Sequence, residues 1–501
     1  MLLTDSEMMR EADRNAFALA DIPTALLMRN AGDALALSAA EMLAPGETAA
    51  VFCGTGNNGG DGIAAAAKLL CMGFEARVYL VGKREKLSPD AKEMESCLLE
   101  LGGALTDLPA EDPDISDCAA VIDALFGTGL SRPVEGDALR AVRLMNGSGL
   151  PVVSCDIPSG ISADTGAVLG EAVRADVTVT FAMPKVGHYA APGCLYCGDV
   201  RTADIGIPYE FLCGCGVQAV MREDVSILPR AKDAHKGDFG RVLVLGGSVG
   251  LTGAPTMSAK AALRTGAGLV SVGVPEPIYG ITAVKNDEAM PFPLAADPDG
   301  KLSAAALPVI LDRLKKADVC VLGPGLGRSE DITKLVFRLV RESRVPLVLD
   351  ADALNALREN PDVMLAAECP LILTPHEGEF ARLLGRPVED RIADACAFAQ
   401  EYGCTVVLKG AATVMAFPKG DVLLNTTGGP SLAKGGSGDV LCGMLAALLC
   451  VLPVRKAVAA AVWLHGRAGD LCTEQLGENG VLACDVISAI PQAMREISER
   501  K

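Results

Sequence analysis

The sequence predicts an α/β protein of two domains in tandem, each built on a largely parallel sheet, and three observations lead to that prediction. The 501 residues exceed what one hydrophobic core usually holds. Short apolar runs alternate with Ala-rich helical runs, the pattern of a parallel sheet covered by helices. The alternation stops after Ile205 and restarts at Arg241, so we expect a first domain over 1–220 and a second over 221–501.

Composition narrows the class of protein. Half of the residues are hydrophobic and 22% are charged, as in packed globular proteins. A net charge of −18 argues against nucleic-acid binding. We find no apolar signal core near the N-terminus and no apolar run of membrane-spanning length. The 17 cysteines are scattered and lie mostly within apolar runs, which is typical of reduced, buried thiols. We therefore expect a cytoplasmic protein without a membrane partner.

The elements of the first domain follow in order. The first 45 residues predict two helices with a break at Ile22-Pro23, the first capped by Asp5 or Ser6. Strand-like runs come next, with helices after most of the early ones: TAAVFC, ARVYLV, AAVIDA, PVVSC, VTVTF and DVRTADI. This order indicates a Rossmann-like parallel sheet with helices on both faces.

The second domain repeats the pattern. Its predicted strands are RVLVLGGS, LVSVGV, DVCVLG, PLVLDA, PLILTP, TVVLKG, ATVMAF and DVLLN. Three helical segments close the chain, beginning at GGSGDVL, VRKAVAA and ACDVISA. A second open α/β sheet is the expected result.

The loop CGTGNNGGDG, residues 53–62, contains the G-x-G-x-x-G spacing of dinucleotide-binding turns. The second strand, however, ends in Val81-Gly82-Lys83-Arg84 and lacks the acid that grips a ribose in those sites. Asn57, Asn58 and Asp61 instead offer amide and carboxylate oxygens beside a helix N-terminus. The loop could bind a cation together with a phosphate or ribose, or it could be a tight turn with a cap.

Other polar residues follow neighbouring strands. Asp123 ends the third strand, and Asp156 and Ser159 follow the fourth. Because ligands bind at the carboxyl ends of strands in open α/β sheets, we expect these side chains and Asn58 at one crevice. Oxygen ligands without His or Cys suit a hard cation, here a monovalent one. Helix capping is the alternative role for each acid taken singly.

GNNGGDG, DALFGTGL, CDIPSG with ISADTG, and FAMPKVGH resemble the N-terminal domain of NAD(P)H-hydrate epimerases, which interconvert the R and S forms of hydrated nicotinamide coenzymes. The resemblance implies that potassium binds Asn58, Asp123 and Ser159. Asp156 would perform acid–base work, with Lys185 as a second candidate. Arg29 stands where the family more often has an acid. By the same resemblance the damaged coenzyme would contact Asn57, Asn58, Gly59, Gly60, Asp61, Gly127, Thr128, Gly129, Leu130, Ser131, Arg132, Pro133 and Asp156.

The motif GGSGDVLCG, residues 435–443, predicts an anion-binding helix N-terminus in the second domain. Open backbone N–H groups there stabilise a transferring phosphoryl group, and Asp439 can take a hydroxyl proton. No Walker sequence occurs, so a P-loop is not the nucleotide site. A simple helix cap is the alternative. The motif resembles the anion hole of ribokinase-like enzymes.

With LGGSVGLTGAPTMSAKAALRTGAG, LGPGLG, LDADALN, TPHEGEF, LKGAATVM and NTTGGPSLAKGGSGD, the domain resembles the ribokinase-like, ADP-dependent NAD(P)H-hydrate dehydratases. Asp439 would deprotonate the substrate hydroxyl, ADP would phosphorylate it, and phosphate would leave, with Mg²⁺ bridging the nucleotide phosphates. Asp350 and Asp352 are candidates for orienting the metal's ligands, a structural role being the alternative. Glu377 replaces the family's usual Pro after His376. The implied substrate contacts are Ala254, Gly325, His376 and Asp439, and the implied nucleotide contacts are Lys409, Gly410, Ala411, Ala412, Thr413 and Gly438.

The remaining motifs give weaker indications of function. Cys194, Cys197, Cys213 and Cys215 approach a zinc-ligand spacing, although the second pair is one residue short. We expect His465 to be a satisfied core residue, and His188 and His235 to lie in loops, with His235 at the surface.

Together the two resemblances predict a homo-oligomeric bifunctional repair enzyme that acts on NAD(P)H hydrate with ADP, with K⁺ in the first domain and Mg²⁺ in the second. A ribokinase-type kinase of a vitamin-precursor alcohol with an N-terminal ligand-binding domain is the alternative. A non-catalytic first domain is a further alternative, which the polar residues at the strand ends disfavour.

Overall fold

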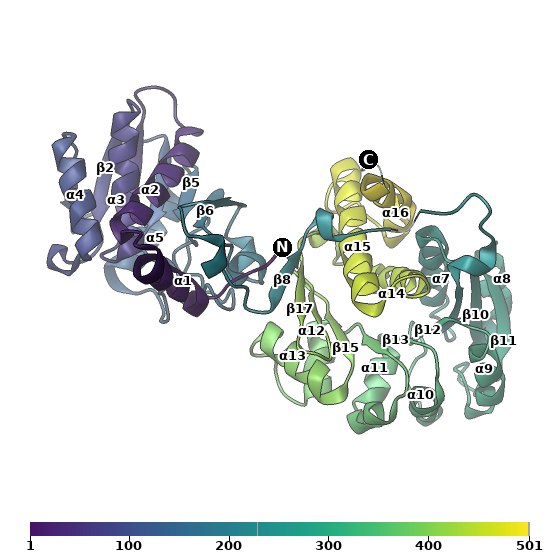
Figure 1. Cartoon of the computed structure of the whole chain (residues 1–501). Coiled ribbons are helices and arrows are strands. Elements are labelled where there is room, and N and C mark those ends of the chain that lie inside the picture. Colours follow the sequence, from purple (N-terminus) through teal and green to yellow (C-terminus); the bar gives the residue numbers. More distant parts are fainter. Residues whose placement is uncertain (228, 499–501) are drawn as a thin grey trace. The chain divides into compact units, whose positions relative to one another are not determined.

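The computed structural model describes residues 1–227 and 229–498, and it confirms the α/β class (Figure 1). Two compact units are present, Leu2–Gln218 and Ala219–Lys501, the second including Met1. Each unit is built on one sheet, and each is described by itself below. In the described part of the chain, no helix is both long and apolar enough to cross a membrane.

The N-terminal unit has a seven-stranded sheet of order β3-β2-β1-β4-β5-β6-β7, and every neighbouring pair is parallel. This order reverses direction beside β1, as in Rossmann-like folds. Its strands are β1 (Thr48–Cys53), β2 (Glu75–Leu80), β3 (Leu105–Asp107), β4 (Ala120–Ala124), β5 (Val152–Cys155), β6 (Val177–Phe181) and β7 (Asp199–Ala203). Its helices are α1 (Ser6–Ala20), α2 (Thr24–Ala40), α3 (Asn57–Cys71), α4 (Pro89–Glu100), α5 (Gly136–Gly147) and α6 (Val186–Tyr189).

Successive residues of each strand point to opposite faces of this sheet, and both faces are covered by helices. Val51 and Cys53 of β1 pack with the apolar sides of α2, α3 and α4, whereas Ala50 and Phe52 pack against α5. Local signals place the helices where the sequence predicts them. The Asp5 carboxylate accepts hydrogen bonds from the N–H groups of Glu7 (3.0 Å) and Met8 (2.8 Å), which caps α1 as expected.

The C-terminal unit has a ten-stranded sheet of order β11-β10-β9-β12-β13-β14-β15-β16-β17-β8. The strands from β11 to β15 pair in parallel, and β16 is antiparallel to both β15 and β17. The strands are β8 (Val217–Val220), β9 (Arg241–Leu245), β10 (Leu269–Pro275), β11 (Met290–Leu294), β12 (Val319–Leu322), β13 (Leu347–Leu349), β14 (Leu371–Leu373), β15 (Thr405–Leu408), β16 (Val414–Ala416) and β17 (Val422–Asn425).

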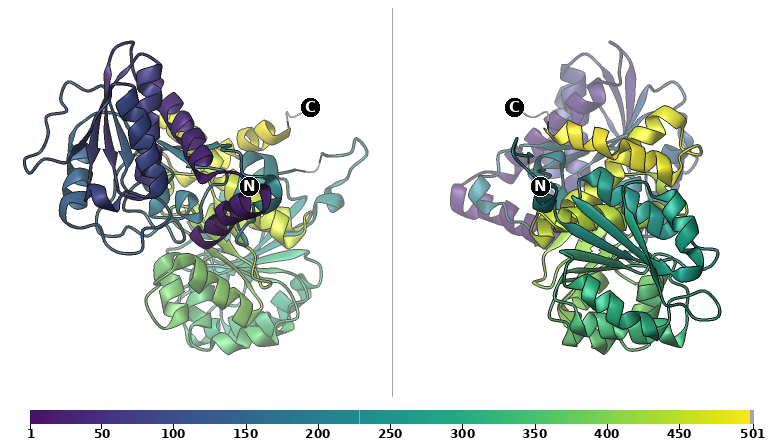
Figure 2. Two further views of the ribbon diagram at one scale, coloured as in Figure 1. Left: turned by 60° about the vertical axis from the view of Figure 1, so that its left-hand side comes forward. Right: turned by 90° about the vertical axis from the view of Figure 1, so that its right-hand side faces the viewer.

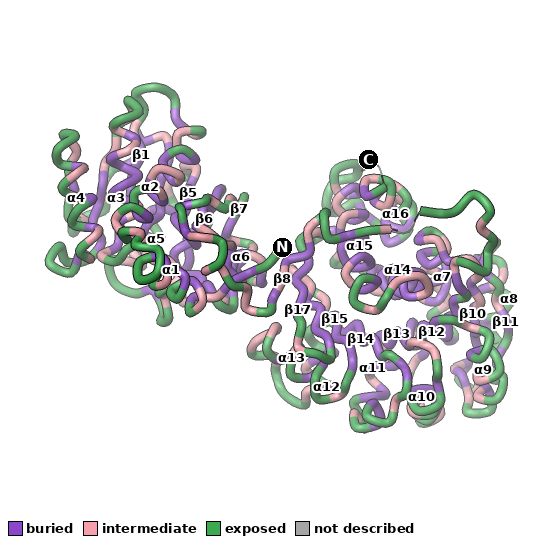
Figure 3. Tube along the Cα trace, viewed as in Figure 1, coloured by how far each residue is buried: buried purple, intermediate pink, exposed green. Residues whose placement is uncertain are grey.

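Helices cover both faces of this second sheet (Figures 1 and 2). One face packs on α7, α14, α15 and α16, forming a core that includes Val242, Val244 and Val321. The tube coloured by burial shows that the central strands are buried (Figure 3). The helices of this unit are α7 (Gly253–Thr265), α8 (Glu276–Lys285), α9 (Leu307–Leu314), α10 (Glu330–Glu342), α11 (Asp352–Leu357), α12 (Glu377–Leu384), α13 (Arg391–Tyr402), α14 (Ser437–Leu449), α15 (Val454–Leu476) and α16 (Ala483–Ser498).

Candidate functional site

The N-terminal unit has a cavity of about 520 Å³ at the carboxyl ends of its strands. The loop between β1 and α3 forms one part of its wall, and the loop after β4 forms another. Helices α1 and α2 contribute a third part. Of the residues predicted to contact substrate, the cavity is lined by Asn57, Asn58, Asp61, Gly127, Thr128, Gly129, Leu130 and Asp156, but not by Gly59, Gly60, Ser131, Arg132 or Pro133.

Glycines allow the two loops to approach each other closely. A Cβ on Gly59 would lie 1.9 Å from the Gly54 carbonyl oxygen, and one on Gly54 would lie 2.1 Å from that of Leu125. A Cβ on Gly127 would lie 2.8 Å from Oδ1 of Asn58. These glycines therefore serve close backbone packing, which is one of the roles that glycine has in dinucleotide-binding turns.

Asp156 lies at the centre of the charged groups of this cavity. Its Oδ1 accepts hydrogen bonds from Lys185 Nζ (2.5 Å) and from Thr180 Oγ1 (3.1 Å). Burial of the carboxyl raises its pKa, but the Lys185 ammonium, together with His188 and Thr180, lowers it, so the net pKa lies below the usual value. Asp156 has φ of 65°, a left-handed conformation that is unusual for a residue with a Cβ. The carboxylate is thus held ionised in the cavity wall.

Lys185 and His188 orient this carboxylate from the start of α6. Lys185 is fully buried, and its ammonium also donates to Thr180 Oγ1 (2.9 Å) and to the Phe181 carbonyl (3.1 Å). His188 Nδ1 accepts from the Lys185 N–H, and Nε2 donates to the Asp156 carbonyl. Burial, followed by the Lys185 charge, lowers the pKa of His188 to about 4, so the ring is neutral. The expectation that His188 lies in a loop was wrong, because it is buried in a short helix.

Asp123 and Ser159 lie behind the cavity wall rather than in it. The fully buried Asp123 carboxylate accepts from Ser159 Oγ (2.6 Å), Ser159 N–H (2.8 Å) and Ser154 Oγ (2.9 Å). Burial raises the pKa of Asp123 despite these bonds. No basic side chain in the described part of the chain forms an ion pair with it. A buried carboxylate with only neutral donors would be stabilised by a cation.

In the C-terminal unit the anion-hole motif forms the first turn of α14. The helix has no side-chain cap, so the N–H groups of Gly438 and Asp439 have no acceptor within the helix. Burial, and then the nearby Asp350 charge, raises the pKa of Asp439 to about 7, although Lys409 opposes that shift. Asp439 can therefore hold or release a proton near neutral pH.

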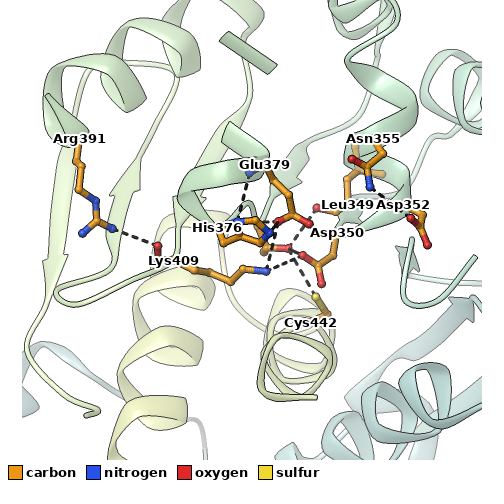
Figure 4. A network of polar contacts seen from close by, with 10 residues as sticks. Leu349, Asp350, Asp352, Asn355, His376, Glu379, Arg391, Lys409 and Cys442 are labelled. Carbon is orange, nitrogen blue, oxygen red and sulfur yellow. Dashed lines mark hydrogen bonds and ion pairs between the residues drawn. The ribbon is translucent and has the colours of Figure 1, made fainter. Parts of the chain in front are cut away.

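A partly buried ion pair supports this turn (Figure 4). Lys409 Nζ donates to Asp350 Oδ1 (2.9 Å), which also accepts from Thr374 Oγ1 (2.9 Å). A Cβ on Gly438 would lie 3.2 Å from Lys409 Nζ, so the ammonium lies against the start of α14. Burial opposes the charge of Lys409, but the carboxylates of Asp350 and Glu379 raise its pKa above the ordinary value. A fixed positive charge thus lies beside the open N–H groups.

The predicted substrate residues are brought to this turn by packing. A Cβ on Gly325 would lie 3.4 Å from Cβ of Ala254, at the start of α7. Helix α7 contacts α14, since Ser258 Oγ donates to the Asp439 carbonyl (2.9 Å). His376 caps α12 by accepting the Glu379 N–H, and its neighbour Pro375 accepts the Lys409 N–H. Glu377 occupies the first position of α12 without disturbing this cap.

The predicted nucleotide segment Lys409–Thr413 forms the loop between β15 and β16. Arg391 holds this loop by donating to the carbonyl oxygens of Ala411 (2.9 Å), Leu408 (3.2 Å) and Lys409 (3.2 Å). Arg391 and Thr374 carry no sequence signal for these roles, because their partners lie about 20 residues or more away along the chain. Glu379 was also not predicted, although it forms a capping box with His376, three residues before it. Asp352, a candidate for orienting metal ligands or for a structural role, accepts the Gly327 N–H and an Asn355 amide hydrogen (Figure 4).

Three further expectations concern the cysteine pattern and two histidines. In residues 1–227 and 229–498, no three His, Cys, Asp or Glu side chains are arranged to hold a metal ion, which speaks against the zinc alternative. His235 is exposed, as expected. His465 is buried, as expected, but its Nε2 has no hydrogen-bond partner, so the prediction that it is fully satisfied was wrong.

Comparisons with known proteins match each unit separately. The family model for NAD(P)H-hydrate dehydratase matches residues 242–492, and the model for the YjeF-related protein N-terminus matches residues 24–187. The chain is similar over its whole length to a bifunctional NAD(P)H-hydrate repair enzyme from Moorella thermoacetica, with 40% identity over 100% of this chain and 98% of that protein.

The chain is also similar to a second relative and to two solved structures. A protein of the same description from Thermofilum pendens is 38% identical over 97% of this chain and 95% of its own. A ribokinase-like superfamily protein from Enterococcus faecalis has a TM-score of 0.51 and 27% identity over 57% of this chain and 98% of its own. An ADP/ATP-dependent NAD(P)H-hydrate dehydratase from Bacillus subtilis, co-crystallized with ATP/Mg²⁺, is 32% identical over 57% of this chain and 100% of its own, with a TM-score of 0.49.

Proposed function

The chain belongs to the family of bifunctional NAD(P)H-hydrate repair enzymes, and on that premise we propose how its residues carry out the two reactions. The N-terminal unit epimerises R and S NAD(P)H hydrate, and the C-terminal unit dehydrates the S form to NAD(P)H with ADP. The observation that carries this conclusion is the 40% identity to a repair enzyme over the full length of the chain. Each unit also has a separate charged site.

In the C-terminal unit, Asp439 removes the proton from the hydroxyl of the hydrated ring. The hydroxyl oxygen then attacks the terminal phosphorus of ADP, and AMP leaves. Elimination of phosphate and loss of a ring proton restore the double bond, since phosphate is a far better leaving group than hydroxide. The Asp439 pKa of about 7 suits a base that works near neutral pH.

The groups around Asp439 suit the phosphoryl group. The open N–H groups at the start of α14 and the Lys409 ammonium supply positive potential where charge develops. Asp350 holds that ammonium in place. Ala254, Gly325 and His376 would contact the hydrated coenzyme, whereas Lys409–Thr413 and Gly438 would contact ADP. Mg²⁺, when bound, would neutralise the nucleotide phosphates, which usually provide most of its ligands besides water.

In the N-terminal unit, Asp156 exchanges a proton with the oxygen atom at the hydrated carbon. Its ionised state, enforced by Lys185, makes it the base that activates a water molecule. Asn57, Asn58, Asp61 and the loop of Gly127 to Leu130 would bind the coenzyme within the cavity. Gly59, Gly60 and Ser131 to Pro133 would act by shaping the two loops.

Potassium fits the residues behind this wall. Asp123 has a buried carboxylate with neutral donors alone, and Asn58 and Ser159 add the neutral oxygen ligands that a monovalent cation accepts. A bound K⁺ would supply the positive charge that Asp123 lacks. It would also fix Asn58, whose Nδ2 is buried without a partner, at the edge of the cavity.

Separate assays of the two epimers test this proposal. The S form with ADP should regain the absorbance of reduced nicotinamide, and it should not do so without nucleotide. The R form with ADP should regain it only through epimerisation. The proposal would be overturned if the S form with ADP regained no absorbance and the protein instead phosphorylated a vitamin-precursor alcohol, such as a pyrimidine alcohol, with ATP.

A further inference from the structure

Besides Asp156, the cavity of the N-terminal unit is lined by an exposed carboxyl that comes from α1. Helix α1 turns Met9, Arg10 and Asp13 toward this cavity, and Asp156 reaches it from the loop after β5. Met9 and Asp13 are four residues apart, so they share one side of the helix. Asp13 is thus placed on the wall that encloses Asp156, and the analysis of motifs did not identify it.

Asp13 differs from Asp156 in what surrounds its carboxyl. Asp156 accepts from Lys185 and Thr180, but the Asp13 carboxyl accepts no hydrogen bond and forms no ion pair within the described part of the chain. Arg10, its neighbour on the cavity wall, is bonded to Ser6 instead. The Asp13 carboxyl is therefore available to a bound molecule.

Charge in the cavity favours a proton on this group. The titratable groups on the cavity walls come from α1, α3, α4, the loop after β5 and the start of α6, and they are Arg10, Asp13, Asp61, Asp90, Asp156 and Lys185. The one ammonium among them is engaged by Asp156. Asp13 is an exposed residue, but the protein around its carboxyl still desolvates it in part and raises its pKa to about 6, while Lys185 lowers the pKa and Asp156 raises it slightly. Asp156 stays ionised, so the two carboxyls favour opposite protonation states.

Inversion of the hydrated carbon needs such a pair. The reduced nicotinamide ring contains an enamine, and hydration places the hydroxyl on the carbon next to the ring nitrogen. The lone pair of that nitrogen can therefore help the hydroxyl to leave. An acid protonates the hydroxyl, the C–O bond breaks, water leaves, and the nitrogen lone pair forms a C=N⁺ bond. A second water molecule then adds to the other face of that carbon, and a base takes its proton. The ring regains its original composition with the opposite configuration, and one proton has passed from the acid to the base.

We propose that Asp13 is a catalytic residue of the epimerase reaction, donating the proton to the departing hydroxyl while Asp156 accepts the proton of the incoming water. In the reverse direction the two carboxyls exchange roles. Asp61 and Asp90 also line the cavity, but both are less exposed than Asp13. Burial raises the pKa of Asp61 well above its usual value, so Asp61 also holds a proton, but its Oδ2 lies 4.0 Å from Cys155 Sγ. The inference rests on the proposed epimerase function of this unit.

The test compares Asp13→Asn with wild type in the whole chain. With ADP present, the S form reports dehydration alone, and the R form reports epimerisation followed by dehydration. Loss of a general acid costs about 100-fold or more, so we expect the R-form rate to fall by about 100-fold. The S-form rate should stay within a factor of about two of wild type. Glu11→Gln is the matched control, because Glu11 is exposed on the same helix and does not line the cavity.

The possible outcomes separate the inference from the function on which it rests. If wild type fails to convert the R form faster than buffer does, the epimerase function itself is wrong. If wild type converts it and Asp13→Asn does so equally well, the role of Asp13 is overturned. Asp13→Asn should also unfold at an equal or higher temperature than wild type, since it removes an unpaired charge from a cluster of acids.

A second readout does not depend on how the variant folds. Because the active form carries a proton on Asp13 and none on Asp156, wild-type epimerisation should decline as pH rises above about 6. The rate is followed as conversion of the R form to the S form without ADP, because dehydration has its own pH dependence. An epimerisation rate that stays flat or increases from pH 5 to pH 8 would overturn the proposal. Asp13→Glu, which keeps a carboxyl, should retain more R-form activity than Asp13→Asn.

Discussion

Two acids are assigned to the proposed chemistry of the two units. Asp439 and Asp156 each lie beside a lysine, half-buried Lys409 and fully buried Lys185, and their electrostatic surroundings differ. Asp156 bonds its lysine directly and has a lowered pKa, whereas Lys409 bonds Asp350 and leaves Asp439 with a pKa raised to about 7. The sequence patterns identified both acids, but they could not show which one is ionised, because the lysine pairing depends on contacts that are distant along the chain.

Replacing Asp439 should separate the two activities. Asp439→Asn removes the base, so dehydration of the S form should fall by about 10² to 10⁴, while R-to-S conversion continues. In wild type the base must be ionised, and the dehydration rate should therefore increase as pH rises through about 7. Rates with each epimer between pH 6 and pH 8 check both points. A folded variant that loses both activities would contradict independent sites.

Exchange of the monovalent cation tests the role given to Asp123. Replacing K⁺ with tetramethylammonium should lower the R-form rate about tenfold or more and leave the S-form rate unchanged. Asp123→Asn should remove this response, because the buried negative charge is gone. Equal R-form rates in both salts for wild type would show that no small monovalent cation is needed.

At the scale of elements, the predicted strands are present and the errors fall at sheet edges. The strands missing from the sequence analysis are β3, β8 and β11, and each lies at one end of its sheet. Strand β11 has the sequence MPFPL, and its two prolines argue against a strand in sequence-based reasoning. Proline is nevertheless tolerated in an edge strand, where one side of the strand forms no sheet hydrogen bonds. Central strands are uniformly apolar because both of their faces are buried, and this makes them recognisable.

The contact between α7 and α14 positions the dehydratase residues, and it can be tested with two glycines. A Cβ on Gly443 would lie 2.1 Å from the Ser258 carbonyl oxygen, so Gly443→Ala should destabilise the C-terminal unit by about 3 kcal/mol and slow S-form dehydration. Gly280→Ala in α8 meets no atom within 4 Å and should stabilise the unit by about 1 kcal/mol. Denaturant unfolding of both variants measures these changes, and equal stability of the two would contradict the packing argument.

At the scale of the whole molecule, one chain combines two reactions that share an intermediate. The first unit supplies the S form from the R form, and the second consumes it with ADP, so both damaged epimers reach NAD(P)H. The acid assigned to epimerisation and the base assigned to dehydration have pKa values of about 6 and about 7. The two activities should therefore respond to pH in opposite directions.

A single progress curve tests this account most directly. The protein is incubated with a mixture of R and S NADH hydrate and excess ADP, and the absorbance of reduced nicotinamide is followed to its end point. The account predicts complete recovery of this absorbance, in one phase from the S form and another from the R form. Asp439→Asn should abolish both phases, because each ends in dehydration. Recovery that stops at the S fraction, with the remaining R form converting no faster than it does without protein, would contradict it.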